Sequence, residues 1–122
     1  MSCRWALVLL LLCGCQMIDR KLLVDASRNQ IIRVENGDRY YFSLKEDVAS
    51  GKKWYCSVDN PDVEVTIDHD GLDEADVRIR VHRGFSKSAH LRFTYEAFGA
   101  EEPLKTFTIG LFRRTGDVAF WK

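Results

Sequence analysis

The feature of this sequence that most restricts its fold is a series of short segments in which apolar and polar residues alternate. Seven such segments occur, at 30–34, 39–44, 54–58, 63–67, 77–81, 91–95 and 106–111. Successive side chains of a β-strand point to opposite faces, so a period of two predicts strands with one buried face each. No stretch keeps the spacing of an amphipathic helix for long enough to form one. The sequence therefore predicts an all-β domain of two antiparallel sheets, each with one face in water.

Turn-forming residues separate the alternating segments. Asn-Gly-Asp at 36–38 predicts a hairpin turn, because Asn-Gly accepts positive φ at both central positions. Asn-Pro-Asp at 60–62 predicts a second turn. Short strands with turns at roughly every 8–12 residues are typical of a β-sandwich. We therefore predict a seven-stranded immunoglobulin-like β-sandwich with Greek-key connections, although the Cys…Trp…Cys spacing of antibody domains is missing.

The amino-terminal residues have the pattern of an export signal. An apolar run from Trp5 to Cys13 follows Arg4. It is shorter than the roughly 20 residues that span a bilayer core, and it suits the apolar part of a secretion signal. The run ends in Leu-Cys-Gly-Cys at 12–15, which resembles a bacterial lipobox and implies cleavage before Cys15 with lipid on its sulfur. The alternatives are an ordinary signal cut elsewhere and a short buried apolar segment.

These features divide the chain into three predicted parts. They are a signal peptide at 1–14, a lipidated tether at 15–28 and a β-sandwich domain at 29–122. Two or more acyl chains hold a protein firmly at a membrane. Gln16 follows the predicted lipidated cysteine, and the lack of Asp there implies, by resemblance to bacterial lipoproteins, the outer rather than the inner membrane. We therefore expect a monomer anchored by lipid in a bacterial cell envelope.

Charge and cysteine content exclude several classes of function. The chain has 18 basic and 18 acidic residues, whereas a protein that binds nucleic acid usually has a basic excess. Once Cys3 and Cys13 leave with the signal and Cys15 carries lipid, Cys56 alone remains, so no disulfide is expected. Cys56 lies mid-strand on the predicted buried face, where a thiol is inert. We therefore predict no nucleic-acid partner, no cofactor and no catalytic residue, and we expect that the chain is not an enzyme.

Two places in the domain have residues of the kinds that bind metal ions. His82 and His90 flank the turn at Gly84, but two histidines without a third ligand make a poor zinc site. The acidic segment 68–76 places carboxylates around Gly71, which suits the oxygen coordination of calcium, although the EF-hand spacing is not met. The alternative is a loop that its charges keep in water. No metal ligand is assigned, and calcium binding by this segment stays open.

Three connections between the predicted strands are candidates for function, at 45–53, 68–76 and 96–103. In a Greek-key sandwich these three connections emerge at the same end. Loops on a rigid scaffold commonly carry binding function, and loops of eight or nine residues exceed the usual hairpin length. The alternative is that they only connect strands. We expect them to form one binding surface.

The residues around these loops resemble the chagasin family of cysteine-protease inhibitors, over roughly residues 29–112. The family has Asn-Pro-Thr-Thr-Gly with Trp three positions after the Gly. Ala-Ser-Gly-Lys-Lys-Trp at 49–54 keeps a hydroxyl residue, the Gly and the Trp at that spacing. Phe-Thr-Tyr-Glu-Ala-Phe at 93–98 and Lys-Thr-Phe-Thr-Ile at 105–109 match the flanks of the family's third loop. The family's loop between the fourth and fifth strands contains a glycine, and Gly71 represents it in this chain.

This chain departs from the family at several contact positions. Asp47 and Val48 replace Asn-Pro, Lys52 replaces an aromatic residue, and Ala97-Phe98 replaces Arg-Pro-Trp. Because the bulky third-loop anchor has become a smaller one, we expect weaker inhibition than a typical member of the family gives.

The resemblance implies a function and a set of contact residues. Members of the family block papain-like cysteine proteases by filling the active-site cleft with these loops. The implied protease-binding residues are Ser50, Gly51, Lys52, Asp70, Gly71 and Phe98. We therefore predict a lipid-anchored inhibitor of papain-like cysteine proteases. The alternatives are a non-inhibitory envelope lipoprotein that binds another protein, and a calcium-dependent adhesive domain.

Overall fold

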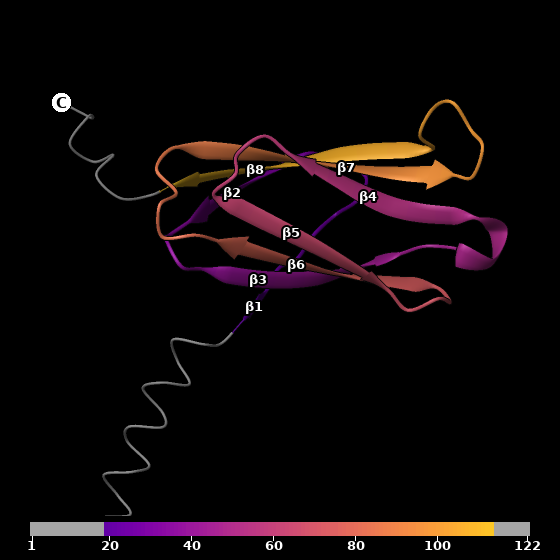
Figure 1. The fold of residues 1–122 in the computed structure, drawn as a ribbon, viewed down its shortest axis with the longest axis horizontal. Helices are drawn as coiled ribbons and strands as arrows, with labels where there is room; N and C mark the ends of the chain where they lie inside the picture. The colour runs from indigo at the N-terminus through magenta and orange to yellow at the C-terminus, as the bar shows by residue number, and fades with distance from the viewer. Residues whose placement is uncertain (1–18, 114–122) are drawn as a thin grey trace, which may run out of the picture.

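The computed structural model describes residues 19–113, which form two four-stranded sheets packed face to face (Figure 1). This confirms the predicted all-β sandwich. The predicted signal peptide and Cys15 lie outside the described residues, as does the tail beyond Arg113. Within the described part of the chain there is no helix with the length and apolarity that crossing a bilayer requires.

Each predicted segment is a strand, and one further short strand precedes them, which makes eight in residues 19–113. The first sheet has the order β1 (Arg20–Lys21), β3 (Arg39–Lys45), β6 (Glu74–Val81) and β5 (Val63–His69). The second sheet has the order β2 (Gln30–Val34), β8 (Lys105–Arg113), β7 (Ser88–Ala97) and β4 (Lys52–Val58). A single 3₁₀ turn, η1 (Val48–Ser50), lies between β3 and β4. The chain passes from one sheet to the other after β1, β2, β3, β4 and β6, so most connections cross between the sheets.

The core lies between the sheets and is built from the apolar side of each alternating segment. In β6, burial alternates without exception from Glu74 to Val81. Trp54 and Phe93, which the alternation predicts to face inward, are buried. The Phe93 and Phe107 rings stack with their centroids 4.9 Å apart, and Trp54 meets Phe107 edge to face at 5.4 Å. Such aromatic pairs add about 0.5–1.5 kcal/mol beyond the area that they bury.

The prediction of wholly antiparallel sheets is wrong at two strands. β1 pairs in parallel with β3, and β2 pairs in parallel with β8. The turn at 36–38 forms, with Gly37 at φ +87°, but it joins β2 and β3, which belong to different sheets, and is therefore not a hairpin. Asn-Gly determines a local reversal of the chain, whereas the partner of a strand depends on contacts that are distant in sequence.

Part of the segment predicted as a tether belongs to the folded domain. After β1, the amide of Leu22 donates to the carbonyl of Tyr41 at 2.9 Å. Leu22, Val24 and Ala26 then pack against the core. The folded domain therefore begins at about β1 rather than at the predicted residue 29. Every second residue of the segment 22–26 is apolar and packs against the core.

The three candidate connections are shorter than predicted. β5 and β6 extend into the acidic segment, so that only four residues, 70–73, connect them. The connection between β3 and β4 is 46–51, and that between β7 and β8 is 98–104. Length alone therefore does not mark the 68–76 segment as unusual, and the case for a site rests on how the loops are placed.

Candidate functional site: the three-loop end

The β3–β4, β5–β6 and β7–β8 loops lie together at one end of the sandwich, as predicted (Figure 1). The β3–β4 loop lies between the other two and bonds to both of them. Its Val48 amide donates to the carbonyl of Leu72 at 3.3 Å, and its Gly51 carbonyl accepts from the amide of Phe98 at 2.8 Å. We call this arrangement the three-loop end. Backbone bonds between loops make it one connected surface.

The β3–β4 loop is a tight, self-capped turn. Asp47 accepts from the Ser50 hydroxyl at 2.8 Å and caps η1. Gly51 closes the turn in the left-handed conformation, with φ at +74°. A Cβ added to Gly51 would lie 3.1 Å from the Cβ of Phe98, which is tighter than ordinary contact. Two features therefore favour glycine at this position. One is the positive φ, and the other is the close approach of the β7–β8 loop at Phe98. Lys52 follows directly as the first residue of β4.

The β5–β6 loop is shaped by Asp70. Its Oδ1 accepts from the amides of Leu72 at 2.7 Å and Glu74 at 3.2 Å. These backbone donors, Leu72 first, hold the pKa of Asp70 below its usual value. Gly71 at φ +82° carries the reversal. Leu72 is thereby presented to solvent with 72% of its surface exposed.

Calcium coordination is not evident in this loop. Oδ1 of Asp70 accepts hydrogen bonds from backbone amides. Among residues 19–113, no group of three or more His, Cys, Asp or Glu side chains is arranged to hold a metal ion.

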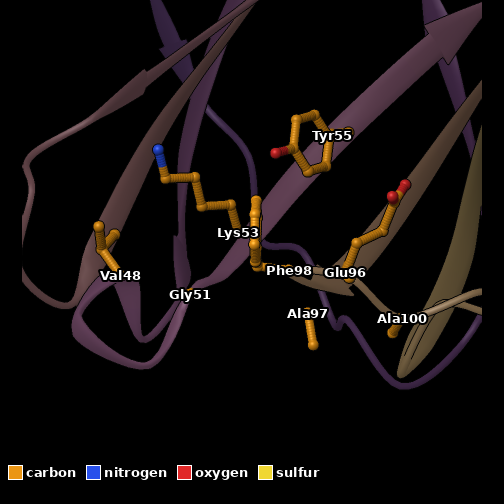
Figure 2. A pocket seen from close by; sticks show the side chains of 9 residues that line it. Val48, Gly51, Lys53, Tyr55, Glu96, Ala97, Phe98 and Ala100 are labelled. Carbon is orange, nitrogen blue, oxygen red and sulfur yellow. The ribbon is translucent and has the colours of Figure 1, made fainter.

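The β7–β8 loop carries the most exposed aromatic residue of the described chain. Phe98 has 94% of its surface in solvent. Figure 2 shows it beside a shallow groove that is also lined by Lys53, Tyr55 and Glu96. An aromatic side chain held this far out of the core loses hydrophobic stabilisation, because it leaves apolar surface in water.

The structure brings together some of the predicted contact residues more closely than others. Ser50, Gly51 and Phe98 form the centre, where the β3–β4 and β7–β8 loops touch. Asp70 and Gly71 lie on the neighbouring loop, where they shape the turn. Lys52 is half-buried at the start of β4. No predicted contact residue lies away from this end.

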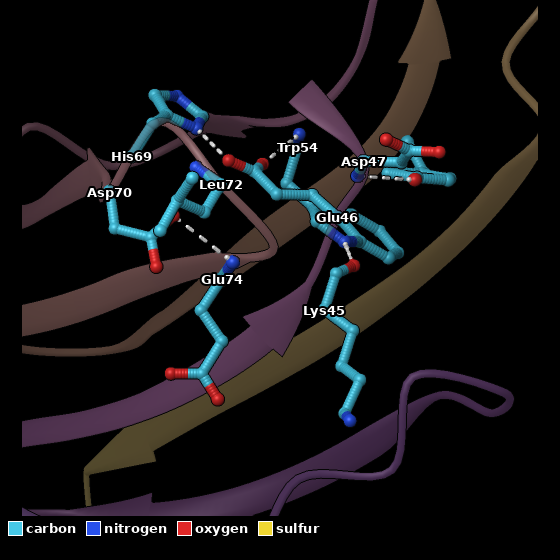
Figure 3. A network of polar contacts seen from close by, with 9 residues as sticks. Lys45, Glu46, Asp47, Trp54, His69, Asp70, Leu72 and Glu74 are labelled. Carbon is cyan, nitrogen blue, oxygen red and sulfur yellow. Dashed lines mark hydrogen bonds and ion pairs between the residues drawn. The ribbon is translucent and has the colours of Figure 1, made fainter. Parts of the chain in front are cut away.

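Sequence reasoning missed three residues at the three-loop end. Leu72 is an apolar residue inside an acidic segment, and this contrast is a signal that could have identified it. Glu46 and His69 are the other two (Figure 3). The side chain of Glu46 has no exposed surface, and its Oε2 lies 2.7 Å from Nδ1 of His69. Glu46 lies in the β3–β4 loop and His69 at the end of β5, so no local pattern reveals the pair.

The remaining candidates for chemistry take structural roles. Burial raises the pKa of the Cys56 thiol to about 12, which keeps it protonated and unreactive near neutral pH. Nδ1 of His90 lies 2.9 Å from Oδ2 of Asp59. The predicted inert Cys56 thus agrees with its surroundings.

Two sheets joined mainly by crossing connections, with three loops gathered at one end, define an immunoglobulin-like β-sandwich. Two solved structures share this fold. One is the crystal structure of the cysteine protease inhibitor EhICP2 from Entamoeba histolytica, which is 14% identical with a TM-score of 0.62, over 78% of this chain and 94% of that one. The other is the solution structure of amebosin, which is 15% identical with a TM-score of 0.64, over 80% of this chain and all of that one. No protein-family model matches the sequence, and no curated protein matches it by sequence. At these identities the likeness establishes the fold.

Proposed function

We propose that this protein inhibits papain-like cysteine proteases by inserting its three-loop end into the active-site cleft. The observation that carries the proposal is the pair of exposed apolar tips, Leu72 and Phe98, on either side of a hydrogen-bonded central loop. The cysteine protease inhibitor EhICP2 has the same fold, which supports this choice of target.

The mechanism that this geometry supports is exclusion of substrate rather than chemistry. The loops are bonded to one another in the free protein, so little conformational freedom is lost when they bind. Ser50 and Gly51 lie between the two tips, where the backbone at a glycine can approach a partner closely. Phe98 is the larger anchor and Leu72 the smaller one. Lys52, Lys53 and Asp70 border the surface, where charges affect the rate of association more than affinity.

The lipid anchor is also part of the proposal, at Cys15 in the outer membrane of a bacterial envelope. β1 pairs with the first residues of β3, at the end of β3 that is far from the loops. From Cys15 to β1 the chain reaches at most about 17 Å. An anchor there would hold the opposite end nearer the membrane and leave the three-loop end free. Labelling cells with a radioactive fatty acid tests this, because wild type should be labelled and Cys15→Ser should not.

Inhibition is tested by titrating the chain from Gln16 onward against papain and a cathepsin. Competitive inhibition with a well-defined constant supports the proposal. If a correctly folded protein inhibits neither enzyme, the proposal fails. The alternative, a non-inhibitory module that binds another envelope protein through the same surface, would then take its place. The replacement of Asn-Pro by Asp47 and Val48 favours that alternative, because Asp47 is used to cap the loop.

A further inference from the structure

The most unusual buried group in the described chain is the carboxylate of Glu46. It is the only charged residue in residues 19–113 that is buried. Its Oε1 accepts from the amide of Trp54 at 3.1 Å, and its Oε2 lies 2.7 Å from Nδ1 of His69. Both carboxylate oxygens are therefore satisfied, which is the condition under which a charge can be buried.

The contacts of Glu46 join three strands that lead into or out of the three-loop end. Glu46 follows β3 directly, Trp54 belongs to β4 and His69 is the last residue of β5. The backbone amide of Glu46 also donates to the carbonyl of Asp73 at 2.9 Å. As Figure 3 shows, Glu46 lies between His69 and Trp54, at the point where the β3–β4 and β5–β6 loops meet.

Burying a paired carboxylate is a poor way to gain stability, because well-packed apolar residues often do as well or better. What a buried pair supplies in some proteins is a single arrangement, since any other arrangement leaves a charge without a partner. Glu46 lies where the β3–β4 and β5–β6 loops meet, and the other fully buried residues of the described chain are hydrophobic.

We propose that Glu46 and His69 are positioning residues that hold the β3–β4 and β5–β6 loops in the one arrangement that can bind a protease. The expected effect on protease inhibition rests on the proposed function, whereas the positioning of the loops rests on the structure alone. Glu46 and His69 do not touch the partner. They act by fixing Val48 and Leu72, whose backbone hydrogen bond joins the two loops.

Three variants and a matched control test the proposal. His69→Ala removes the partner of the carboxylate, and Glu46→Met removes the carboxylate itself while keeping an apolar side chain of similar length. His69→Asn should restore function, because its amide nitrogen lies near the place of Nδ1 and can donate to the carboxylate. His90→Ala is the control, since it breaks a similar pair with Asp59 that is exposed and lies at the opposite end.

Two measurements are made on each variant. The first is the inhibition constant against papain, which should weaken about tenfold or more for His69→Ala and Glu46→Met, because misplaced interface groups lose binding energy. The second is amide hydrogen exchange at Glu46 and Val48, the donors of the two loop–loop bonds. Their exchange should accelerate about tenfold relative to Ile79 in the core, which reports global unfolding. His69→Asn and His90→Ala should resemble wild type in both.

The outcomes separate this inference from the proposed function. If wild type does not inhibit papain, the proposed function fails, and the exchange measurement alone decides the positioning role. If loop and core amides accelerate equally, the pair only stabilises the fold and the inference is wrong. If Glu46→Met folds and both inhibits and exchanges like wild type, the inference is also wrong. A double variant no worse than either single one would support it, because residues that act as a pair are not additive.

Discussion

The two ends of this sandwich are built from the same kinds of connection but distribute their residues in opposite ways. At the end away from the three loops, Phe85 is completely buried and the Asp59–His90 pair is exposed. At the three-loop end, Phe98 is almost completely exposed and Glu46 is buried. The far end thus follows the ordinary rule of apolar residues inside and charges outside. The reversal at the other end has an energetic cost, and such departures are expected at functional sites.

The largest difference between the two ends should appear in the free energy of unfolding when Phe85 and Phe98 are each replaced by alanine. Phe85→Ala should lower the free energy of unfolding by about 3–5 kcal/mol, because a fully buried ring leaves a cavity. Phe98→Ala should change it by less than about 0.5 kcal/mol, as is usual for an exposed residue. Denaturant unfolding of both variants measures the difference. Equal losses would mean that Phe98 packs against the protein and that the ends do not differ as described.

The same contrast can be sharpened with protease binding. Phe98→Ala should weaken inhibition of a papain-like protease by at least about 1 kcal/mol, and Leu72→Ala by a similar or smaller amount, because a few anchor residues carry most of the binding energy and aromatic residues are favoured among them. Ile31 is a matched control, since it is 78% exposed on β2, away from the loops. Ile31→Ala should leave the inhibition constant unchanged. A loss as large as that of Phe98→Ala would place the binding surface elsewhere.

Replacing the two glycines of the three-loop end with alanine should reduce the stability of the protein by different amounts. Gly51 and Gly71 both have positive φ, but a Cβ meets Phe98 only at Gly51. Gly71→Ala should destabilise by about 1 kcal/mol from backbone strain alone, and Gly51→Ala by more, with weaker inhibition. Thermal or denaturant unfolding decides this. Because any side chain at Gly51 would disturb the free loop, a weaker inhibition constant for Gly51→Ala does not by itself show contact with the protease.

The smallest effect concerns one acid at each end. Backbone and side-chain hydrogen bonds from His90 lower the pKa of Asp59, and backbone bonds, from Leu72 first, lower that of Asp70. A carboxyl whose pKa is lower when folded adds stability that is present above its unfolded pKa of about 3.9 and lost as pH falls through the folded value. Following the carboxyl carbons by NMR from pH 5 to 2 should show both titrating below that value. Replacing either residue with Asn should flatten the acid branch of the stability curve only slightly.

Alternation determined how much of this fold could be predicted. It assigned the inward face correctly for Phe42, Ile79 and Phe107, because each strand has one side in the core. It could not assign the parallel partner of β2, since pairing through the backbone leaves no pattern in the side chains. It placed Phe98 and Gly51 at one end through the Greek-key rule. It could not find the contact between Glu46 in the β3–β4 loop and His69 in β5, because the two residues are 23 apart in the sequence.

The short strand β1 has a consequence for how the protein can be handled. It pairs with Tyr40 and Tyr41, and so covers the first part of the outer edge of β3, where backbone amides and carbonyls would otherwise be unpaired. Bare edges of this kind recruit strands from other molecules. A chain shortened to residue 29 in order to remove the predicted anchor would lose that cover along with Leu22 and Val24. We therefore expect such a shortened chain to self-associate more readily than one that keeps β1.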